Sequence, residues 1–409
     1  MVNVCDAIMG TGKTSAAIAY MNEHKNDKFI YITPYLDEAA RIKQSCPDLH
    51  FVEPSNQIRH YRNQKYLHTV ALVEQGRNIA TTHQAFKAYT PDLLENIQKQ
   101  GYTLFIDENV DVLEKADFHP DDVQIAIDAG YIAEHDGVYT IVNSEYNGLA
   151  LEDMFRIMKS RDMVRIEGDE SGWLYFWALP PDLLSAFKDV FILTYLFTGQ
   201  SLHHLIEMNS IPYRYISVHK AGDGFVFGES PGYTPDYVNH LKDMIDIYEG
   251  KMNCIGDGRF DISQNWLTRN TGGCVEILKN NIYNYFRNVW GDAGADRRLW
   301  SSYKSGLEKL KGKGYTSSFL SFNTKATNKY KDRDILVYAA NVFMNVAEKQ
   351  YYVTHGIDVD EDAFALSVMV QWIWRSAIRV GRKIHIYIPS RRMRTLLRDW
   401  IENVSNGGN

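Results

Sequence analysis

The sequence predicts an α/β fold in which parallel sheets are flanked by helices, in two domains. Apolar, strand-like runs alternate with helix-like stretches through the first half of the chain, as strand–helix–strand units require. A glycine-rich loop joins the first strand to the first helix. The length of 409 residues exceeds what one hydrophobic core usually supports. We therefore expect one domain over residues 1–199 and a second over residues 200–409.

The first motif is the glycine-rich loop. Residues 2–6 form a short apolar run typical of a buried strand, and the alanine-rich residues 15–20 are typical of a helix. Two glycines between them permit positive φ angles, which turn backbone N–H groups toward phosphate oxygens. The pattern G-x-x-x-x-G-K-[ST] is met except that Ala7 replaces the first glycine. The expected nucleotide-binding residues are Gly10, Thr11, Gly12, Lys13, Thr14 and Ser15.

Two side chains of this loop have expected roles in catalysis. Lys13 would reach the β- and γ-phosphates, and the Thr14 hydroxyl would hold Mg²⁺. The alternative is a chance Gly-Lys-Thr sequence at the start of a helix. The predicted strand–loop–helix context favours the phosphate-binding loop.

Two acids form the second motif. The apolar run 103–106 is followed directly by Asp107 and Glu108. Ligands of open α/β sheets bind at the carboxyl ends of the strands, so both carboxylates are expected near the nucleotide. We expect Asp107 to coordinate Mg²⁺ through its water shell and Glu108 to orient or deprotonate the attacking water. The alternative is a pair of acids that only solubilise a loop.

The remaining elements are predicted from apolar runs and their boundaries. In the first domain we expect further strands at 28–34, 49–52, 78–81 and 190–194, with helices at 36–45 and 64–74. Between residues 111 and 190, short helical segments and a hairpin interrupt the alternation of strands and helices, which indicates an insertion. In the second domain we expect strands at 213–218, 318–322, 335–338 and 383–388. Helices are expected near 235–249, 276–289, 361–379 and 391–404, with an irregular stretch at 250–275.

The third motif lies near the C-terminus. In the helix predicted over residues 364–379, Gln371, Arg375 and Arg379 are spaced four apart and would share one helical face. Arginine is always charged and binds phosphate oxygens through a fork of donors. This face therefore suggests guanidinium groups that the second domain delivers to the γ-phosphate. The alternative is a basic, solvated helix face.

Together these segments resemble superfamily 2 helicases, and the compact plan is most similar to small helicases encoded by bacteriophages. Residues 7–14 resemble motif I, residues 107–110 the Asp-Glu box of motif II, and residues 371–379 motif VI. The resemblance implies two RecA-like domains, with ATP as the nucleotide and Mg²⁺ as its metal. It also implies contacts to nucleic acid from two segments of the first domain and a motif V-like segment of the second, through Thr33, Pro34, Thr82, His83, Lys325, Thr327 and Asn328.

The expected function is that of an ATP-dependent helicase or translocase, a hydrolase that steps along a strand in phage replication, recombination or repair. Its expected partner is single-stranded or branched DNA, with RNA as the alternative. Tyr195 and Leu196 stand where motif III usually has Ala-Thr, and the arginine spacing of motif VI also departs from the usual pattern. These departures leave two alternatives. One is a DNA translocase or annealing motor without unwinding, and the other is a nucleotide-gated nucleic-acid-binding protein with little turnover.

Composition sets the remaining expectations. The chain is 45% hydrophobic and 23% charged, which is ordinary for a globular protein. No run approaches the roughly twenty apolar residues that span a bilayer, so we expect a cytoplasmic protein without a membrane partner, and we favour a monomer. The net charge of −7 still allows a local basic groove. Basic residues between 297 and 333 alternate with aromatic ones, which suits either a single-strand groove or a solvated face above core aromatics.

Overall fold

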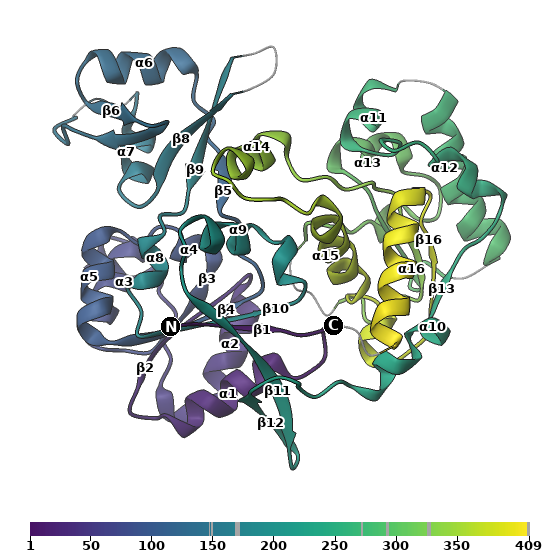
Figure 1. Ribbon diagram of the computed structural model, residues 1–409, viewed down its shortest axis with the longest axis horizontal. Coiled ribbons are helices and arrows are strands. Elements are labelled where there is room, and N and C mark those ends of the chain that lie inside the picture. The colour runs from purple at the N-terminus through teal and green to yellow at the C-terminus, as the bar shows by residue number, and fades with distance from the viewer. Residues whose placement is uncertain are drawn as a thin grey trace. The chain divides into compact units, whose positions relative to one another are not determined.

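The computed structural model describes residues 1–146, 148, 150–167, 172–270, 273–291, 294–324 and 329–406. They form two compact units (Figure 1). The first unit comprises Met1–Ala7, Gly12–Tyr233 and Asn345–Val359, and the second comprises Ile8–Thr11, Thr234–Met344 and Asp360–Asn409. Each unit contains a mainly or wholly parallel sheet flanked by helices, which confirms the predicted α/β class. None of the described helices is both long and apolar enough to cross a bilayer.

The first unit is built on a seven-stranded sheet in the order β12-β11-β1-β10-β4-β2-β3. All neighbouring pairs are parallel except β11 and β12, which form an antiparallel hairpin. Because helices cover a parallel sheet on both faces, its central strands are mainly apolar. The strands are β1 (Val2–Asp6), β2 (Lys28–Thr33), β3 (Ile79–Thr82), β4 (Tyr102–Asp107), β10 (Asp189–Thr194), β11 (Tyr213–Ala221) and β12 (Gly224–Gly228). The principal helices are α1 (Lys13–Glu23), α2 (Leu36–Ser45), α3 (Lys65–Glu74), α4 (His83–Phe86), α5 (Pro91–Gln100), α8 (Asp182–Ser185) and α9 (Ser201–Met208).

The boundary of the first unit lies further along the chain than the predicted boundary after Gly199. Strand β11 pairs in parallel with β1, with Tyr213 opposite Val2. The chain therefore leaves this sheet only after the β11–β12 hairpin, at Tyr233. An apolar run at 213–218 predicts a strand but not the sheet to which the strand belongs.

The predicted insertion forms a separate antiparallel sheet. Its order is β5-β9-β8-β7-β6, with β5 (Leu113–Lys115), β6 (Ile132–His135), β7 (Val138–Ile141), β8 (Asp162–Glu167) and β9 (Trp173–Ala178). Helices α6 (Pro120–Asp128) and α7 (Glu152–Met158) accompany it. The aromatic side chains of Tyr175, Phe176 and Trp177 in β9 are buried, so most of this aromatic strand serves packing.

The second unit is built on a four-stranded parallel sheet in the order β13-β16-β15-β14. Its strands are β13 (Ile245–Ile247), β14 (Arg298–Ser301), β15 (Ile335–Tyr338) and β16 (Ile384–Tyr387). Its helices include α10 (Leu241–Met244), α11 (Gln264–Arg269), α12 (Gly273–Asn284), α13 (Lys304–Leu310), α15 (Glu361–Ile373) and α16 (Arg391–Ser405). Trp300 and Trp372 are fully buried here, and the Trp372 indole donates to the Leu320 carbonyl at 3.0 Å.

Three predictions for the second half were wrong in detail. The helix expected near 235–249 is a 3₁₀ turn and the short helix α10, followed by β13. Residues 318–322 form only an isolated bridge, between Trp300 and Phe319, and no strand. The stretch 250–275, expected to be irregular, contains α11, whose first turn is capped by the Ser263 hydroxyl accepting from Trp266 N at 3.3 Å.

Helix α14 (Val346–Thr354) follows the second unit's strand β15 in sequence but belongs to the first unit. The Ser201 hydroxyl of α9 donates to Glu348 Oε1 at 2.7 Å, and the rings of His204 and Tyr352 lie 4.8 Å apart. Burial raises the pKa of Glu348 to about 7, and the negative charge of Asp111 adds to this effect, while Lys87 opposes it. A partly buried carboxyl group therefore helps to hold α14 in place.

The raised pKa of Glu348 makes the stability of the protein depend on pH. The pKa of Glu348 is near 4.5 in the unfolded state and about 7 in the folded state. At pH values between these two, the folded state therefore binds more protons than the unfolded state. The free energy of unfolding must therefore fall as the pH rises from 5 to 8, on the order of 2 kcal/mol. We expect Glu348→Gln to remove this loss and to be the more stable protein at pH 8. Urea unfolding at pH 5, 6, 7 and 8 measures it, and the exposed Glu74→Gln should leave the wild-type slope unchanged. Parallel slopes in wild type and Glu348→Gln would contradict the assignment.

Candidate nucleotide site

The glycine-rich loop has the backbone that the sequence predicts. Gly10 and Gly12 have φ angles of 85° and 90°. Gly12 is the residue before α1, and no side chain caps this helix. The first turn of α1 therefore presents backbone N–H groups that can donate hydrogen bonds to an anion, as helix N-termini do in phosphate-binding proteins.

Both glycines also lie close to aromatic side chains. A Cβ at position 12 would lie 2.6 Å from the ring of Phe225 in β12, and a Cβ at position 10 would lie 2.8 Å from the Tyr237 hydroxyl oxygen. The Tyr237 hydroxyl donates to the Met9 carbonyl. The loop thus combines positive φ angles with close side-chain contacts that exclude larger residues.

Lys13 begins α1, and its side chain turns back toward the loop. Its Nζ donates to the carbonyl of Ala7. Burial lowers the pKa of Lys13, whereas the nearby carboxylates of Asp107, Asp6 and Glu108 raise it. The structure therefore brings the lysine of the first motif and the two acids of the second motif into one electrostatic cluster.

Asp107 is the last residue of β4 and accepts two side-chain hydrogen bonds. The Tyr31 hydroxyl donates to Oδ2 at 2.8 Å, and the Thr14 hydroxyl donates to the same atom at 3.4 Å. Burial raises the pKa of Asp107 to about 6, and the charge of Glu108 adds to this rise. A hydroxyl and a carboxylate at this distance are the hard oxygen ligands that Mg²⁺ prefers, so these two side chains fit the expected metal.

Glu108 is held in an unusual backbone conformation. Its φ is 63°, which side chains with a Cβ rarely adopt. Its N–H donates to the Leu193 carbonyl of β10 at 3.1 Å, and β10 lies between β4 and β1 in the sheet. The neighbouring strand thus fixes the direction in which the Glu108 side chain leaves the sheet. Strained backbone conformations of this kind are often found at functional sites.

Three further residues position this cluster, and the sequence analysis did not assign them this task. Tyr31 holds Asp107, as described above. The carboxylate of Asp6, at the end of β1, accepts from the N–H groups of Leu196 and Phe197 at 2.8 and 3.0 Å. His83 is buried, and its Nε2 lies 2.8 Å from the Asp107 carbonyl oxygen. For Asp6, the sequence offered one indication of such a role, which is its position directly before the glycine-rich loop.

The residues expected to contact nucleic acid lie at two strand ends of the first sheet. Thr33 ends β2 and is buried, and Pro34 follows it. Thr82 ends β3 and caps α4, with its hydroxyl accepting from Ala85 N at 3.4 Å. Among the described residues, the hydroxyl of Thr33 has no hydrogen-bond partner. The remaining predicted contacts, Lys325, Thr327 and Asn328, lie outside the described residues.

The predicted arginine helix is wrong in its extent. Helix α15 ends at Ile373, so Gln371, Arg375 and Arg379 do not share a helical face. Both the N–H and the hydroxyl of Ser376 donate to the Ile373 carbonyl, at 3.0 and 2.6 Å, and such local bonds compete with the helix. Arg375 is buried in the turn, and Arg379 is exposed on the 3₁₀ helix η8 (Ala377–Val380).

The described part of the basic and aromatic stretch at 297–333 is largely structural. Trp300 and Tyr315 are fully buried in the core of the second unit. Lys309 Nζ donates to the carbonyls of Leu267, Thr268 and Asn270 at the end of α11. Arg297 pairs with Asp334 at 2.5 Å. This part of the chain therefore agrees better with a solvated face above core aromatics than with a groove for bases.

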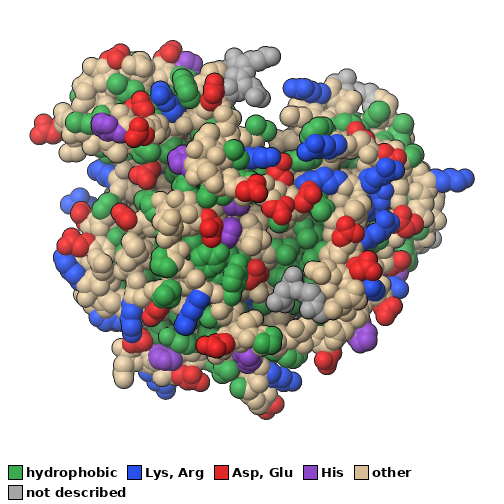
Figure 2. Space-filling view, in the orientation of Figure 1, with side chains coloured by type: hydrophobic (Ala, Val, Ile, Leu, Met, Phe, Trp, Pro, Cys, Tyr) green, Lys and Arg blue, Asp and Glu red, His purple; other side chains and the backbone are tan. Residues whose placement is uncertain are grey.

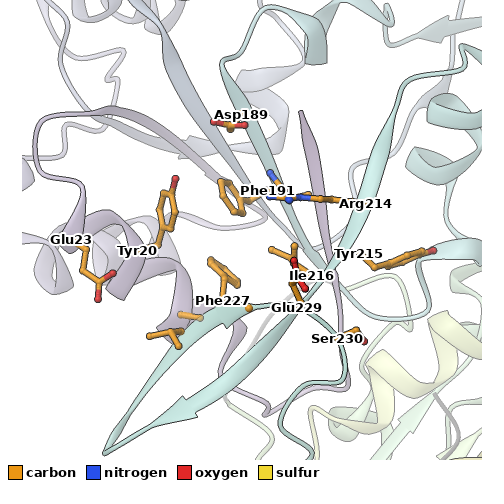
Figure 3. Close-up of a pocket in the computed structure, with 14 residues that line it drawn as sticks. Tyr20, Glu23, Asp189, Phe191, Arg214, Tyr215, Ile216, Phe227, Glu229 and Ser230 are labelled. Atoms are coloured by element: carbon orange, nitrogen blue, oxygen red, sulfur yellow. Dashed lines mark hydrogen bonds between the residues drawn. The ribbon is translucent and has the colours of Figure 1, made fainter.

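A separate hollow of about 620 Å³ lies between α1 and the β11–β12 hairpin (Figure 3). Tyr20, Phe191 and Phe227 form its aromatic wall, and the Arg214 side chain points toward Phe191. Arg214 Nε donates to Asn3 Oδ1 at 2.7 Å. None of Lys13, Thr14, Asp107 and Glu108 lines this hollow, so it is distinct from the nucleotide site.

Comparisons with known proteins place the chain in a family. Residues 239–401 match the family described as the YonV C-terminal Rossmann-like domain. The SPbeta prophage-derived uncharacterized protein YonV of Bacillus subtilis (strain 168) is 39% identical over 417 residues, covering 98% of this chain and 99% of that protein. Its prophage origin agrees with the resemblance to phage-encoded proteins.

Similar solved structures include helicases. An XPD helicase structure is 11% identical, covers 100% of this chain and 95% of its own, and has a TM-score of 0.49. The structure of S. tokodaii Xpd4 is also 11% identical, covers 98% of this chain and 94% of its own, and has a TM-score of 0.48. At these scores the functional argument depends on the residues of this chain. By its full-length match, the chain belongs to the YonV family.

Proposed function

We propose that this protein is an ATP-dependent motor of the helicase or translocase type that acts on nucleic acid. The observation that carries the proposal is the cluster of Lys13, Thr14, Asp107 and Glu108 at one edge of the first sheet. A phosphate-binding loop, a metal-binding carboxylate and a carboxylate that can activate water are the parts that nucleotide hydrolysis needs.

Each member of the cluster has one task. When bound, Mg²⁺ and ATP supply a polarised γ-phosphoryl group. The N–H groups at the start of α1 and the ammonium group of Lys13 neutralise phosphate charge, while Thr14 and Asp107 hold the metal. Glu108 orients a water and accepts its proton. Tyr31, Asp6 and His83 act as positioning residues, because each bonds to the cluster or to the backbone that carries it.

The second unit has a proposed part in hydrolysis and in strand binding. Arg375 is proposed to reach the γ-phosphate on nucleotide binding, because arginine carries a permanent charge and a fork of donors. Thr33, Pro34 and Thr82 are proposed to grip the strand backbone with the first unit, and Lys325, Thr327 and Asn328 with the second. Alternate gripping, coupled to binding and loss of the γ-phosphate, would step the protein along single-stranded or branched DNA.

A phosphate-release assay tests the proposal. The purified protein is incubated with ATP and Mg²⁺, alone and with single-stranded DNA, single-stranded RNA or duplex DNA. We expect hydrolysis that a single strand stimulates, and the comparison of DNA with RNA identifies the partner. A protein that binds ATP but releases no phosphate under all conditions would instead be a nucleotide-gated binding protein. Labelled forks then separate a helicase, which frees a strand, from a translocase or annealing motor, which does not.

Arg375→Ala tests the second unit's part. We expect hydrolysis to fall by about 100-fold, because positive charge at the transition state is lost, while the affinity for ATP changes little. Phosphate release and binding of a fluorescent ATP analogue measure the two effects. The exposed Arg269→Ala, also in the second unit, is the control and should match wild type in both assays. Normal turnover with lost ATP binding would contradict the proposed role.

A further inference from the structure

Four side chains of the second unit form a row in which two neighbouring rings have a guanidinium group at each end, and we call this row the cation–aromatic ladder. The Arg259 guanidinium lies 5.3 Å from the centre of the Phe260 ring, and that ring lies 5.5 Å from the ring of Phe343. The Arg392 guanidinium lies 4.4 Å from the centre of the Phe343 ring. The ladder brings together residues from three separate parts of the sequence.

The ladder exposes a large apolar side chain to solvent. Phe260 is 61% exposed, whereas Phe343 is partly buried. Phe260 is the only large hydrophobic residue with this degree of exposure among the described residues of the second unit between 234 and 270. One exposed ring is too small an apolar patch for a stable protein interface. The Arg259 guanidinium lies over this ring, and the ring surface that stays exposed suits a small planar group.

The loop that carries Phe260 is held in a strained conformation. Ile262, two residues after Phe260, is fully buried and has a φ of 63°, which is costly for a β-branched residue. Its carbonyl accepts from the backbone N–H of Asn341 at 3.0 Å. The loop is therefore kept in this shape by contacts with a distant part of the chain.

Asn341 is the clamp for this loop. It is fully buried, and its Nδ2 donates to the carbonyls of Arg259 and Asp261 at 2.9 and 3.0 Å. Its Oδ1 accepts from Arg392 Nη1 at 3.1 Å. One side chain thus fixes both ends of the ladder. Asn341 follows β15, so the ladder lies near the carboxyl edge of this parallel sheet, where α/β domains bind ligands.

The charges along the ladder favour an anionic partner at one end. Arg392 pairs with Asp362 at 2.6 Å, and the neighbouring Arg391 pairs with Asp257 at 3.0 Å. Within the described residues, Arg259 has no carboxylate partner. Figure 2 shows Lys and Arg side chains gathered over the region of α13 and α16, where Asp and Glu side chains lie among them. An exposed ring next to a guanidinium that makes no ion pair among the described residues matches a nucleobase joined to a phosphate.

We propose that the cation–aromatic ladder is a base-stacking platform for single-stranded nucleic acid, with Phe260 under a base and Arg259 at the adjacent phosphate. The proposal rests on the proposed function and adds to it a contact that reads bases rather than the strand backbone. Duplex bases are stacked on one another, so the platform discriminates against duplex.

The experiment separates bases from phosphates. Fluorescence anisotropy measures binding of a 20-nucleotide oligo-dT and of an abasic oligomer of the same length. We expect wild type to bind oligo-dT about tenfold more tightly than the abasic strand. Phe260→Ala should lose this preference and keep its abasic affinity, while Phe260→Trp should retain the preference. Arg259→Ala should weaken binding to both strands. Tyr283→Ala, an exposed aromatic of α12, is the control and should match wild type.

The outcomes distinguish the platform from the proposed function. Unchanged oligo-dT affinity in a folded Phe260→Ala protein, with wild type still hydrolysing ATP in response to DNA, overturns the platform alone. Absence of both nucleic-acid binding and ATP hydrolysis in wild type overturns the motor and the platform together. ATP hydrolysis without added nucleic acid should be equal in wild type and Phe260→Ala, since Phe260 is not a member of the nucleotide cluster. Thermal unfolding confirms that the compared proteins are folded.

Discussion

The Lys13→Ala protein is expected to lose nucleic-acid-stimulated ATP hydrolysis by at least about 100-fold and to bind ATP more weakly. Lys13 lies in the same electrostatic cluster as Asp107, Asp6 and Glu108, whose charges all raise its pKa. Its removal leaves three neighbouring carboxylates without this compensating charge, so the site would repel a triphosphate instead of attracting it. Phosphate release and binding of a fluorescent ATP analogue measure the two losses.

Lys99→Ala is the matched control. Lys99 is an exposed residue of α5 that pairs with Glu95 at 2.6 Å, and surface pairs of this kind contribute little to stability. This variant should hydrolyse ATP as wild type does. Turnover retained in Lys13→Ala, with the protein folded, would rule out the nucleotide site at this loop.

Glu108→Gln should separate ATP binding from ATP hydrolysis. The amide keeps the size of the side chain but cannot accept a proton from water, so we expect the rate to fall by about 100-fold or more. Binding should be kept or improved, because a negative charge near the phosphates is removed. Single-turnover hydrolysis and equilibrium binding of the ATP analogue give both values. Glu95→Gln, an exposed residue of α5, should change neither. A single-turnover rate close to that of wild type would show that another group activates water.

A second variant at this position tests whether the strained backbone of Glu108 serves function. Asn tolerates a positive φ better than Glu, so Glu108→Asn should relieve some of the strain at φ 63°. We expect this variant to be inactive yet more stable by about 0.5 to 1 kcal/mol. Loss of activity together with a gain in stability would indicate that the strain serves function. Urea unfolding supplies the stability value.

The parts of the site that the sequence predicts are those that follow from neighbouring residues. Gly10, Gly12, Lys13 and Thr14 lie within five positions, so their spacing alone predicts a phosphate-binding loop. An apolar run that ends in two acids likewise identifies the end of β4. Parallel pairing then brings both motifs to one edge of the sheet.

The rest depends on contacts between residues far apart in the sequence. Asp6 bonds to the backbone at Leu196 and Phe197, about 190 positions later, and only the pairing of β1 with β10 makes this contact available. The end of α15 was missed for a local reason, because Ser376 bonds to the Ile373 carbonyl where periodicity alone would continue the helix. Asn341 was missed because a lone asparagine after a strand carries no sequence signal of the loop that it holds.

The route of the chain through its two units limits how the protein can be divided for study. A fragment that stops at Tyr233 would lack α14, and it would expose the surface of α9 that Ser201 and His204 offer to Glu348 and Tyr352. A fragment that starts at Thr234 would carry α14 without those partners. Truncation should therefore yield poorly soluble halves, whereas a first half to which residues 345–359 are fused through a flexible linker should express as a folded product.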